Sequence, residues 1–202
     1  MKDQQRVLST GDTLALALFA IIGVGIAVTS AWMAALRIAE LTSGGHVQVL
    51  AEFVDTAAQA TAGEETLPVL LDRGVVTVDG LMPMGVASGV LGQITFAATV
   101  VGVVFCLLAL SRNLLRGVVF GKVNTGLVMG GGIVGLIGAA ASRFFDNMLA
   151  NAAIAQVTDG SFDTAVLTVE PFPYLLAAFA LSIIGTVFVV GDRLRRETEG
   201  LV

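Results

Sequence analysis

Charged residues are scarce in this chain. Of its 202 residues, 11 are Lys or Arg and 16 are Asp or Glu, together 13% of the sequence. A soluble domain usually carries about a quarter of charged residues. The scarcity excludes a large soluble domain beside the apolar segments. We therefore predict a single membrane domain over residues 1–202.

Cysteine is almost absent as well. Cys106 is the one cysteine of the sequence, so no disulfide can form within the chain and any exported loop must fold without one. We interpret Cys106 as a small packing residue. The run Gly130-Gly131-Gly132 lacks the Lys-Ser/Thr that follows a phosphate-binding loop. No other motif stands out, and we predict no catalytic residue, no metal site and no cofactor.

Apolar residues, by contrast, make up 55% of the chain. Four long stretches approach the ~20 residues that a helix needs to cross about 30 Å of hydrocarbon. They cover about 14–36, 85–110, 123–142 and 172–191. The sequence predicts an all-α integral membrane protein, a bundle of four transmembrane helices. A cleaved signal peptide at the start is the alternative, although its 23-residue apolar core exceeds the usual 7–15.

No Asp, Glu, Lys, Arg or His lies inside these four stretches. Proton relays and ion-coupled carriers usually place ionisable groups at membrane depth, so their absence disfavours such machines. Gln93, Thr95 and Thr99 are among the polar residues there. They predict hydrogen bonds between helices or, alternatively, a polar path.

The basic residues predict how the chain threads through the membrane, because Lys and Arg accumulate in cytoplasmic loops. Eight belong to the N-terminal arm, an inner loop at 111–122 and a tail at 192–202. These eight are Lys2, Arg6, Arg112, Arg116, Lys122, Arg193, Arg195 and Arg196. The outer connections, 37–84 and 143–171, hold only three. We predict that both termini are cytoplasmic and that the two outer connections are extracytoplasmic.

The outer connections contain β-like patterns. After a break at Ser43-Gly44-Gly45, the segments 46–53 and 74–79 partly alternate, and 164–170 is rich in β-branched residues. Alternation marks half-buried strands. Because an isolated hairpin is marginal, we expect these strands to pair across the two connections as a small extracytoplasmic β-containing cap. An amphipathic helix is the alternative over 46–55.

Glycines are dense in the third stretch. Gly126 with Gly130, and Gly131 with Gly135, have the small-xxx-small spacing that lets helices approach closely. We predict that this helix packs tightly, either within the bundle or across a homo-oligomer.

The cytoplasmic segments carry a further pattern. The inner loop contains Gly117, Phe120 and Asn124 as Gly-x-x-Phe-x-x-x-Asn, and the tail from Gly191 to Val202 is rich in Arg and Glu. In both segments the chain resembles a bacterial family of four-helix membrane proteins, a domain of unknown function numbered two-nine-seven-five. It departs from that family at Val119, where the family often has proline before the phenylalanine.

The resemblance implies a bacterial cell membrane and a regulatory or sensing role, since the family has no established activity and its genes often neighbour a small helix-turn-helix regulator. We expect a non-enzymatic protein that couples an extracytoplasmic segment to a cytoplasmic partner, with no direct nucleic-acid binding. A small transporter, channel or export accessory is one alternative. An immunity protein against a membrane-active peptide is another.

The basic residues of the inner loop and tail are the candidate contacts for such a partner or for lipid headgroups. They are Arg112, Arg116, Lys122, Arg193, Arg195 and Arg196. Helix four should continue through 192–199 as a short mixed-charge end, which would place the tail beside the inner loop.

Overall fold

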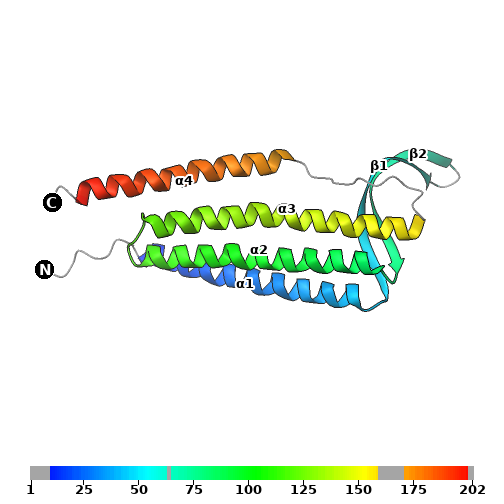
Figure 1. Cartoon of the computed structure of the whole chain (residues 1–202), viewed down its shortest axis with the longest axis horizontal. Coiled ribbons are helices and arrows are strands. Elements are labelled where there is room, and N and C mark those ends of the chain that lie inside the picture. The colour runs from blue at the N-terminus through cyan, green and yellow to red at the C-terminus, as the bar shows by residue number, and fades with distance from the viewer. Residues whose placement is uncertain (1–9, 63–64, 159–170, 200–202) are drawn as a thin grey trace. The chain divides into compact units, whose positions relative to one another are not determined.

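The computed structural model describes residues 10–62, 65–158 and 171–199. Within them, four helices and a two-stranded sheet follow one another along the chain (Figure 1). In order they are α1 (Thr10–Thr42), β1 (His46–Ala62), β2 (Glu65–Asp79), α2 (Pro83–Leu115), α3 (Lys122–Thr158) and α4 (Pro171–Glu199). The prediction of four long apolar helices is confirmed, since each is long and apolar enough to cross a membrane.

The helices extend beyond the apolar stretches that predicted them. The loop expected at 111–122 shrinks to residues 116–121, because α2 continues to Leu115 and α3 begins at Lys122. The third apolar stretch was expected to end at residue 142, but the helix that contains it, α3, continues to Thr158. The reason is a helical spacing of apolar residues past Arg143, where Leu149, Ala153 and Ile154 are buried on one face.

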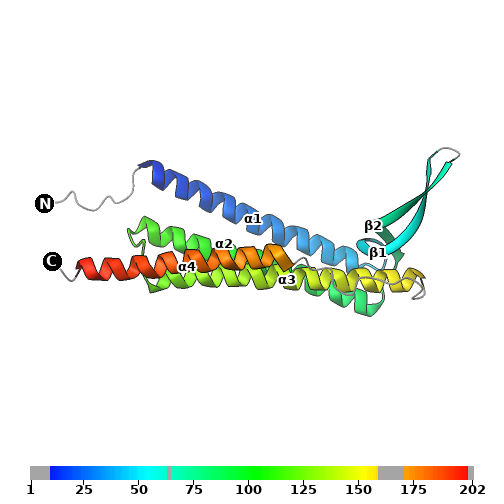
Figure 2. The same ribbon diagram turned by 90° about the horizontal axis from the view of Figure 1, so that it is seen from above.

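The first connection folds into an antiparallel hairpin, with β1 paired to β2 from His46 opposite Asp79 to Ala62 opposite Glu65. The strand interpretation of 46–53 and 74–79 is therefore confirmed over the helical alternative. These two strands pair with each other, and the expected pairing across the two connections would need a strand of the second connection. The third predicted strand, 164–170, lies outside the described residues. Figure 2 shows the two strands twisting about each other.

The pairing register breaks once, between Glu52 and Thr56 of β1. Three residues of β1 then face one residue of β2, which is a β-bulge that locally bends and twists a strand. The bulge divides the hairpin into two parts. We call residues 46–52 and 73–79 the hairpin base, and residues 56–62 and 65–71 the distal hairpin.

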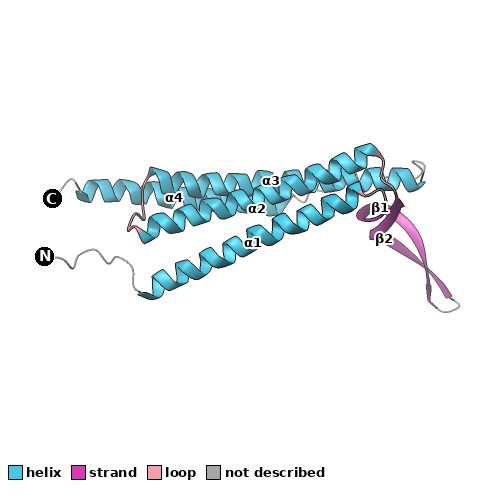
Figure 3. Ribbon diagram, turned by 90° about the horizontal axis from the view of Figure 1, so that it is seen from below, coloured by secondary structure: helices cyan, strands magenta, loops and turns pink. Residues whose placement is uncertain are grey.

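The chain forms two compact units. The hairpin unit comprises residues 34–95 and 140–169, and the helical unit comprises 1–33, 96–139 and 170–202. Figure 3 distinguishes the strands of the hairpin unit from the helices that surround them in sequence.

The hairpin unit contains a core of large apolar side chains. On β1, Val47, Val49 and Ala51 are buried while Gln48 and Leu50 between them are exposed, as the period of two in a strand requires. These residues pack with the end of α1, with β2 and with the second half of α3. The other buried members are Leu41, Val78, Leu149, Ala150, Ala153 and Ile154. This packing supports a hairpin that would be marginal alone.

The helical unit exposes its large apolar side chains. Phe105 of α2 and Phe179 of α4 are about two-thirds exposed, at 67% and 65%. Helices that face lipid need no apolar core, because the surrounding acyl chains are as apolar as the side chains themselves. The helices instead meet at small residues. At Gly131, for example, a Cβ would lie 3.0 Å from the Cβ of Cys106 on α2.

Candidate functional site

The turn between α2 and α3, residues 116–121, is held by hydrogen bonds to the adjoining ends of both helices. The amide of Val118 donates to the carbonyl of Asn113 at 3.0 Å, and the amide of Gly117 donates to the carbonyl of Leu114 at 2.9 Å. These two bonds define a Schellman motif, whose C′ residue adopts a left-handed conformation. Gly117 occupies that position with φ 77°, so the glycine of the Gly-x-x-Phe-x-x-x-Asn pattern ends α2.

Asn124 in the first turn of α3 fixes the other half of this turn. Its side chain is fully buried, and its Nδ2 donates to the carbonyls of Val118 at 2.7 Å and Val119 at 3.0 Å. Its Oδ1 accepts a hydrogen bond from Nδ2 of Asn113 at 2.7 Å. The hydrogen bond from Asn124 to the carbonyl of Val119 thus fixes the turn at this position, where the family often has a proline.

Phe120 joins the turn to α4. Its ring meets the ring of Phe188 edge-on, with centroids 5.9 Å apart, an arrangement that the aromatic quadrupole favours. One helical turn further, a Cβ on Gly191 would come within 2.6 Å of Cδ1 of Phe120. The three residues of the pattern therefore terminate a helix, bind α4 and cap the turn. The sequence carried the pattern but not these three roles.

The basic residues gather at this end of the helical unit. Arg112, Arg116 and Lys122 flank the turn and are exposed, and Phe120 brings α4 beside them. On α4, Arg193 is exposed, whereas Arg196 forms an ion pair with Asp192, Nη2 to Oδ2 at 2.6 Å. The side chain of Arg195 lies outside the described ones.

This end of α4 carries mixed charge, as the sequence predicted. Arg193 and Arg196 line a shallow hollow together with Asp192, Glu197 and Val189. The helix itself continues to Glu199, as expected. Its acids neutralise part of its basic charge, so the strongest positive charge belongs to the turn between α2 and α3.

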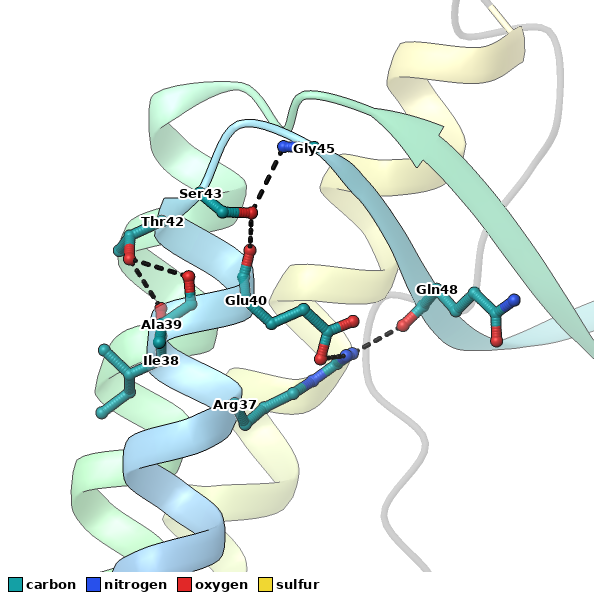
Figure 4. A network of polar contacts seen from close by, with 8 residues as sticks. All are labelled: Arg37, Ile38, Ala39, Glu40, Thr42, Ser43, Gly45 and Gln48. Carbon is teal, nitrogen blue, oxygen red and sulfur yellow. Dashed lines mark hydrogen bonds and ion pairs between the residues drawn. The ribbon is translucent and has the colours of Figure 1, made fainter.

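The hairpin base is joined to α1 through Arg37. Its Nη2 donates to the carbonyl of Gln48 at 2.6 Å, and its Nη1 lies 2.7 Å from Oε2 of Glu40 (Figure 4). Ser43 closes the end of α1 by donating to the carbonyl of Glu40 at 2.8 Å. One guanidinium thus links the last turns of α1 to the backbone of β1.

Further polar contacts join the hairpin base and the segment that follows it, residues 80–82, to α3. Oε1 of Glu52 lies 3.1 Å from Nη2 of Arg73, its cross-strand partner, and 4.0 Å from Nη2 of Arg143. Gln156 donates from Nε2 to the carbonyl of Gly80 at 2.6 Å and accepts from the amide of Met82 at 3.0 Å. The hairpin is therefore attached to α1 and α3 by polar bonds as well as by its core.

The glycines predicted to pack fall into two groups. Gly131 lies against Cys106, and a Cβ on Gly135 would lie 3.5 Å from Cγ2 of Val103. At Gly126 and Gly130, a Cβ would meet nothing within 4 Å among the described atoms. The spacing did not single out Gly132 and Gly138. A Cβ at these two positions would collide with Leu181 and with Thr99, respectively.

An apolar groove of about 490 Å³ opens between α2, α3 and α4 within the helical unit. Its lining comes from small or apolar residues of all three helices. They are Val103, Cys106, Leu107 and Leu110; Leu127, Val128, Gly131, Gly132, Gly135 and Leu136; and Ala177, Ala180, Leu181 and Ile184. Gln93, Thr95 and Thr99 do not belong to this lining, so the groove is not the polar path that a transporter would require.

Within the described residues, no group of three His, Cys, Asp or Glu side chains could hold a metal ion. Comparisons with protein-family models, with curated proteins and with solved structures each give no match for this chain. The resemblance to the bacterial four-helix family stays a prediction that depends on the inner loop and tail.

Proposed function

We propose that this chain is a non-enzymatic regulator or sensor of the bacterial cytoplasmic membrane, with both termini in the cytoplasm. The hairpin would meet a signal outside, and the turn between α2 and α3, together with the end of α4, would bind a cytoplasmic partner. The helix-turn-helix regulator implied by the family resemblance is the first partner to test.

The observation that carries the proposal is the apolar exposure of the distal hairpin. Leu67, Val69 and Leu70 are 51%, 40% and 75% exposed, although a hairpin outside the bilayer faces water. Leu67 and Val69 share one face of β2 by the period of two in a strand, and adjacent exposed apolar groups are typical of interaction sites. The hairpin base is attached to α1 and α3, so a ligand bound at the distal hairpin would shift these two helices.

Connectivity supports transmission to the other side. α2 is one helix from Pro83, which follows the hairpin, to Leu115, which precedes the turn. α3 likewise extends from Lys122, after the turn, to Thr158. A ligand shifts such a protein between two states only by binding one of them more tightly. The proposal therefore requires the turn and α4 to have two arrangements of different partner affinity.

Topology is the first test. A cysteine introduced at Ala62 in a Cys106→Ala background should react with an impermeant maleimide in intact cells, and one introduced at Ser9 should react only after lysis. The expectation follows from the eight basic residues on one side and three on the other. The reverse labelling pattern would overturn the orientation and, with it, the assignment of hairpin and turn.

Partner binding is the second test. The double reversal Arg116→Glu/Arg193→Glu should abolish co-purification of the neighbouring regulator while maleimide labelling shows normal insertion. Arg196→Gln is the matched control, since Arg196 is already paired with Asp192 and its loss should matter less. A correctly inserted double mutant that still binds and still regulates would remove the docking surface.

The hairpin has its own test. Replacing residues 56–71 by a two-residue Asn-Gly turn, which favours tight hairpins, removes the distal hairpin and leaves the base. The shortened protein should insert and bind its partner but lose the response to envelope stress. A preserved response would show that sensing does not need the distal hairpin.

A further inference from the structure

We propose that the groove and the basic turn form one binding site for a single anionic phospholipid, with an acyl chain in the groove and the phosphate at Arg112, Arg116 and Lys122. We call these three residues the basic rim. This inference goes beyond the proposed function. It rests on the membrane placement of the helices and not on the regulator.

The groove needs an occupant because of where it lies. Its lining belongs to segments without Asp, Glu, Lys, Arg or His, which sit in hydrocarbon if the helices span the bilayer. The space exists because the facing positions are small: Gly131, Gly132 and Gly135 on α3, Ala177 and Ala180 on α4. An empty apolar cavity of this size forfeits dispersion contacts along its whole wall. In a bilayer, an acyl chain restores those contacts without bringing in any polar group.

The basic rim selects the headgroup. Arg112 follows the groove residue Leu110 by two positions, and Lys122 precedes Leu127 by five. At about 1.5 Å per residue, both charges lie within roughly 8 Å of the groove along the helix axes. Long basic side chains reach such distances with the charge held in the headgroup layer. A phosphate there would be within reach of either residue.

The rim also lacks counter-charge of its own. No acidic residue occurs between Asp79 and Asp146, so α2, the turn and the first half of α3 carry basic residues alone. On α4, Asp192 is already paired with Arg196. Basic pockets between transmembrane helices are typical sites for anionic headgroups. A zwitterionic headgroup would be attracted less, because its own cation is repelled by the rim that attracts its phosphate.

The experiment uses the full chain in nanodiscs that contain equal parts of phosphatidylglycerol and phosphatidylcholine with the same acyl chains. Native mass spectrometry of the released protein counts the lipids that stay bound. We expect one phosphatidylglycerol, several-fold enriched over phosphatidylcholine. Equal retention of the two lipids, or none of either, would overturn the proposal.

Two neighbouring alanines provide a matched pair. Ala177→Phe fills the groove and should lower lipid retention several-fold, whereas Ala178→Phe, which adds the same ring outside the lining, should not. Arg112→Gln/Lys122→Gln should remove the preference for phosphatidylglycerol. If Ala177→Phe and Ala178→Phe retain lipid equally, or if the charge variant keeps its preference, the site is wrong.

A measurement on the unmodified protein covers the case in which a variant misfolds. Cys106 lines the groove, so a bound acyl chain should slow its alkylation by an apolar maleimide. The rate should fall several-fold when phosphatidylglycerol is added to micelles, and less with phosphatidylcholine. Equal rates would overturn the site. A chain that never integrates into membranes would overturn the proposed function too, whereas an integrated chain without lipid selectivity overturns this inference alone.

Discussion

The two units bury their side chains in opposite ways. Every buried apolar residue found in the described chain belongs to the hairpin unit, from Ala34 and Leu41 on α1 to Ile154 on α3. Among the described residues of the helical unit, the one large side chain that is fully buried is polar, Asn124. Water drives apolar groups inward, whereas lipid does not. The difference therefore indicates that the hairpin unit is stabilised as a water-soluble domain is, and the helical unit by close helix contacts and backbone hydrogen bonds.

The largest effect should come from emptying the core of the hairpin unit. Leu41→Ala should cost about 2–5 kcal/mol of unfolding free energy, because Leu41 is 1% exposed and leaves a cavity. Native-state hydrogen exchange at the amides of Val47 and Val49 in detergent measures the change. Leu36→Ala on the same helix is the control, since Leu36 is 54% exposed. Equal losses in both variants would show that the hairpin unit has no core of the soluble kind.

Asn124→Ala tests the polar side of the comparison. It leaves the carbonyls of Val118 and Val119 and the side-chain Nδ2 of Asn113 without this partner, at a cost of about 1–3 kcal/mol. Hydrogen exchange should become faster at the amides of residues 117–119 while the hairpin keeps its protection. Unchanged exchange at the turn would mean that Asn124 does not hold it.

Gly138→Ala tests close helix packing and should have a smaller net effect. The new methyl collides with Thr99 at a typical cost of about 1–3 kcal/mol, partly offset by the better helix propensity of alanine, about 1 kcal/mol. Gly130→Ala has only the second effect, because nothing lies within 4 Å there. In detergent, Gly130→Ala should have a higher melting temperature than Gly138→Ala. The opposite order would contradict the packing seen at Thr99.

The smallest effect is expected at the exposed start of the hairpin. His46 and Asp79 contact each other through Nδ1 and Oδ1, but both side chains are more than three-quarters exposed, at 79% and 78%. Exposed pairs are worth about 0–1 kcal/mol. His46→Ala should therefore leave the melting temperature of the hairpin unit nearly unchanged. A loss as large as that of Leu41→Ala would show that this contact organises the hairpin.

Much of the fold was accessible from the sequence because two patterns were visible, long charge-free stretches and strand-like alternation. Charge-free stretches predicted the four helices, and alternation at Val47, Val49 and Ala51 predicted the strand that buries them. The distal hairpin was missed because residues 56–66 have no such alternation. Its strands continue by pairing with each other. The extension of α3 was missed because the charge-free stretch ends at residue 142, although Leu149 and Ile154 continue the helical spacing beyond it.

The candidate site was only partly accessible. Gly117, Phe120 and Asn124 could be recognised as a pattern, yet their roles depend on bonds to Asn113 and on Phe188 from a distant helix. The glycine spacing identified α3 as a packing helix but could not tell which face meets a neighbour. Gly126 and Gly130 have the spacing without a contact, whereas Gly138 has the contact. The groove is formed by α2, α3 and α4 together, and the sequence of no single helix indicates it.

The closed turn between α2 and α3 has a consequence for how the protein is made. The ends of two helices leave backbone amides and carbonyls that need partners from outside the helical hydrogen-bond ladder. In this turn, the amides of Gly117 and Val118 and the carbonyls of Val118 and Val119 already have partners in the adjoining ends of α2 and α3. α2 and α3 can therefore leave the translocon together as a preformed helical pair. α1 and α4 would then join a pair whose ends are already fixed.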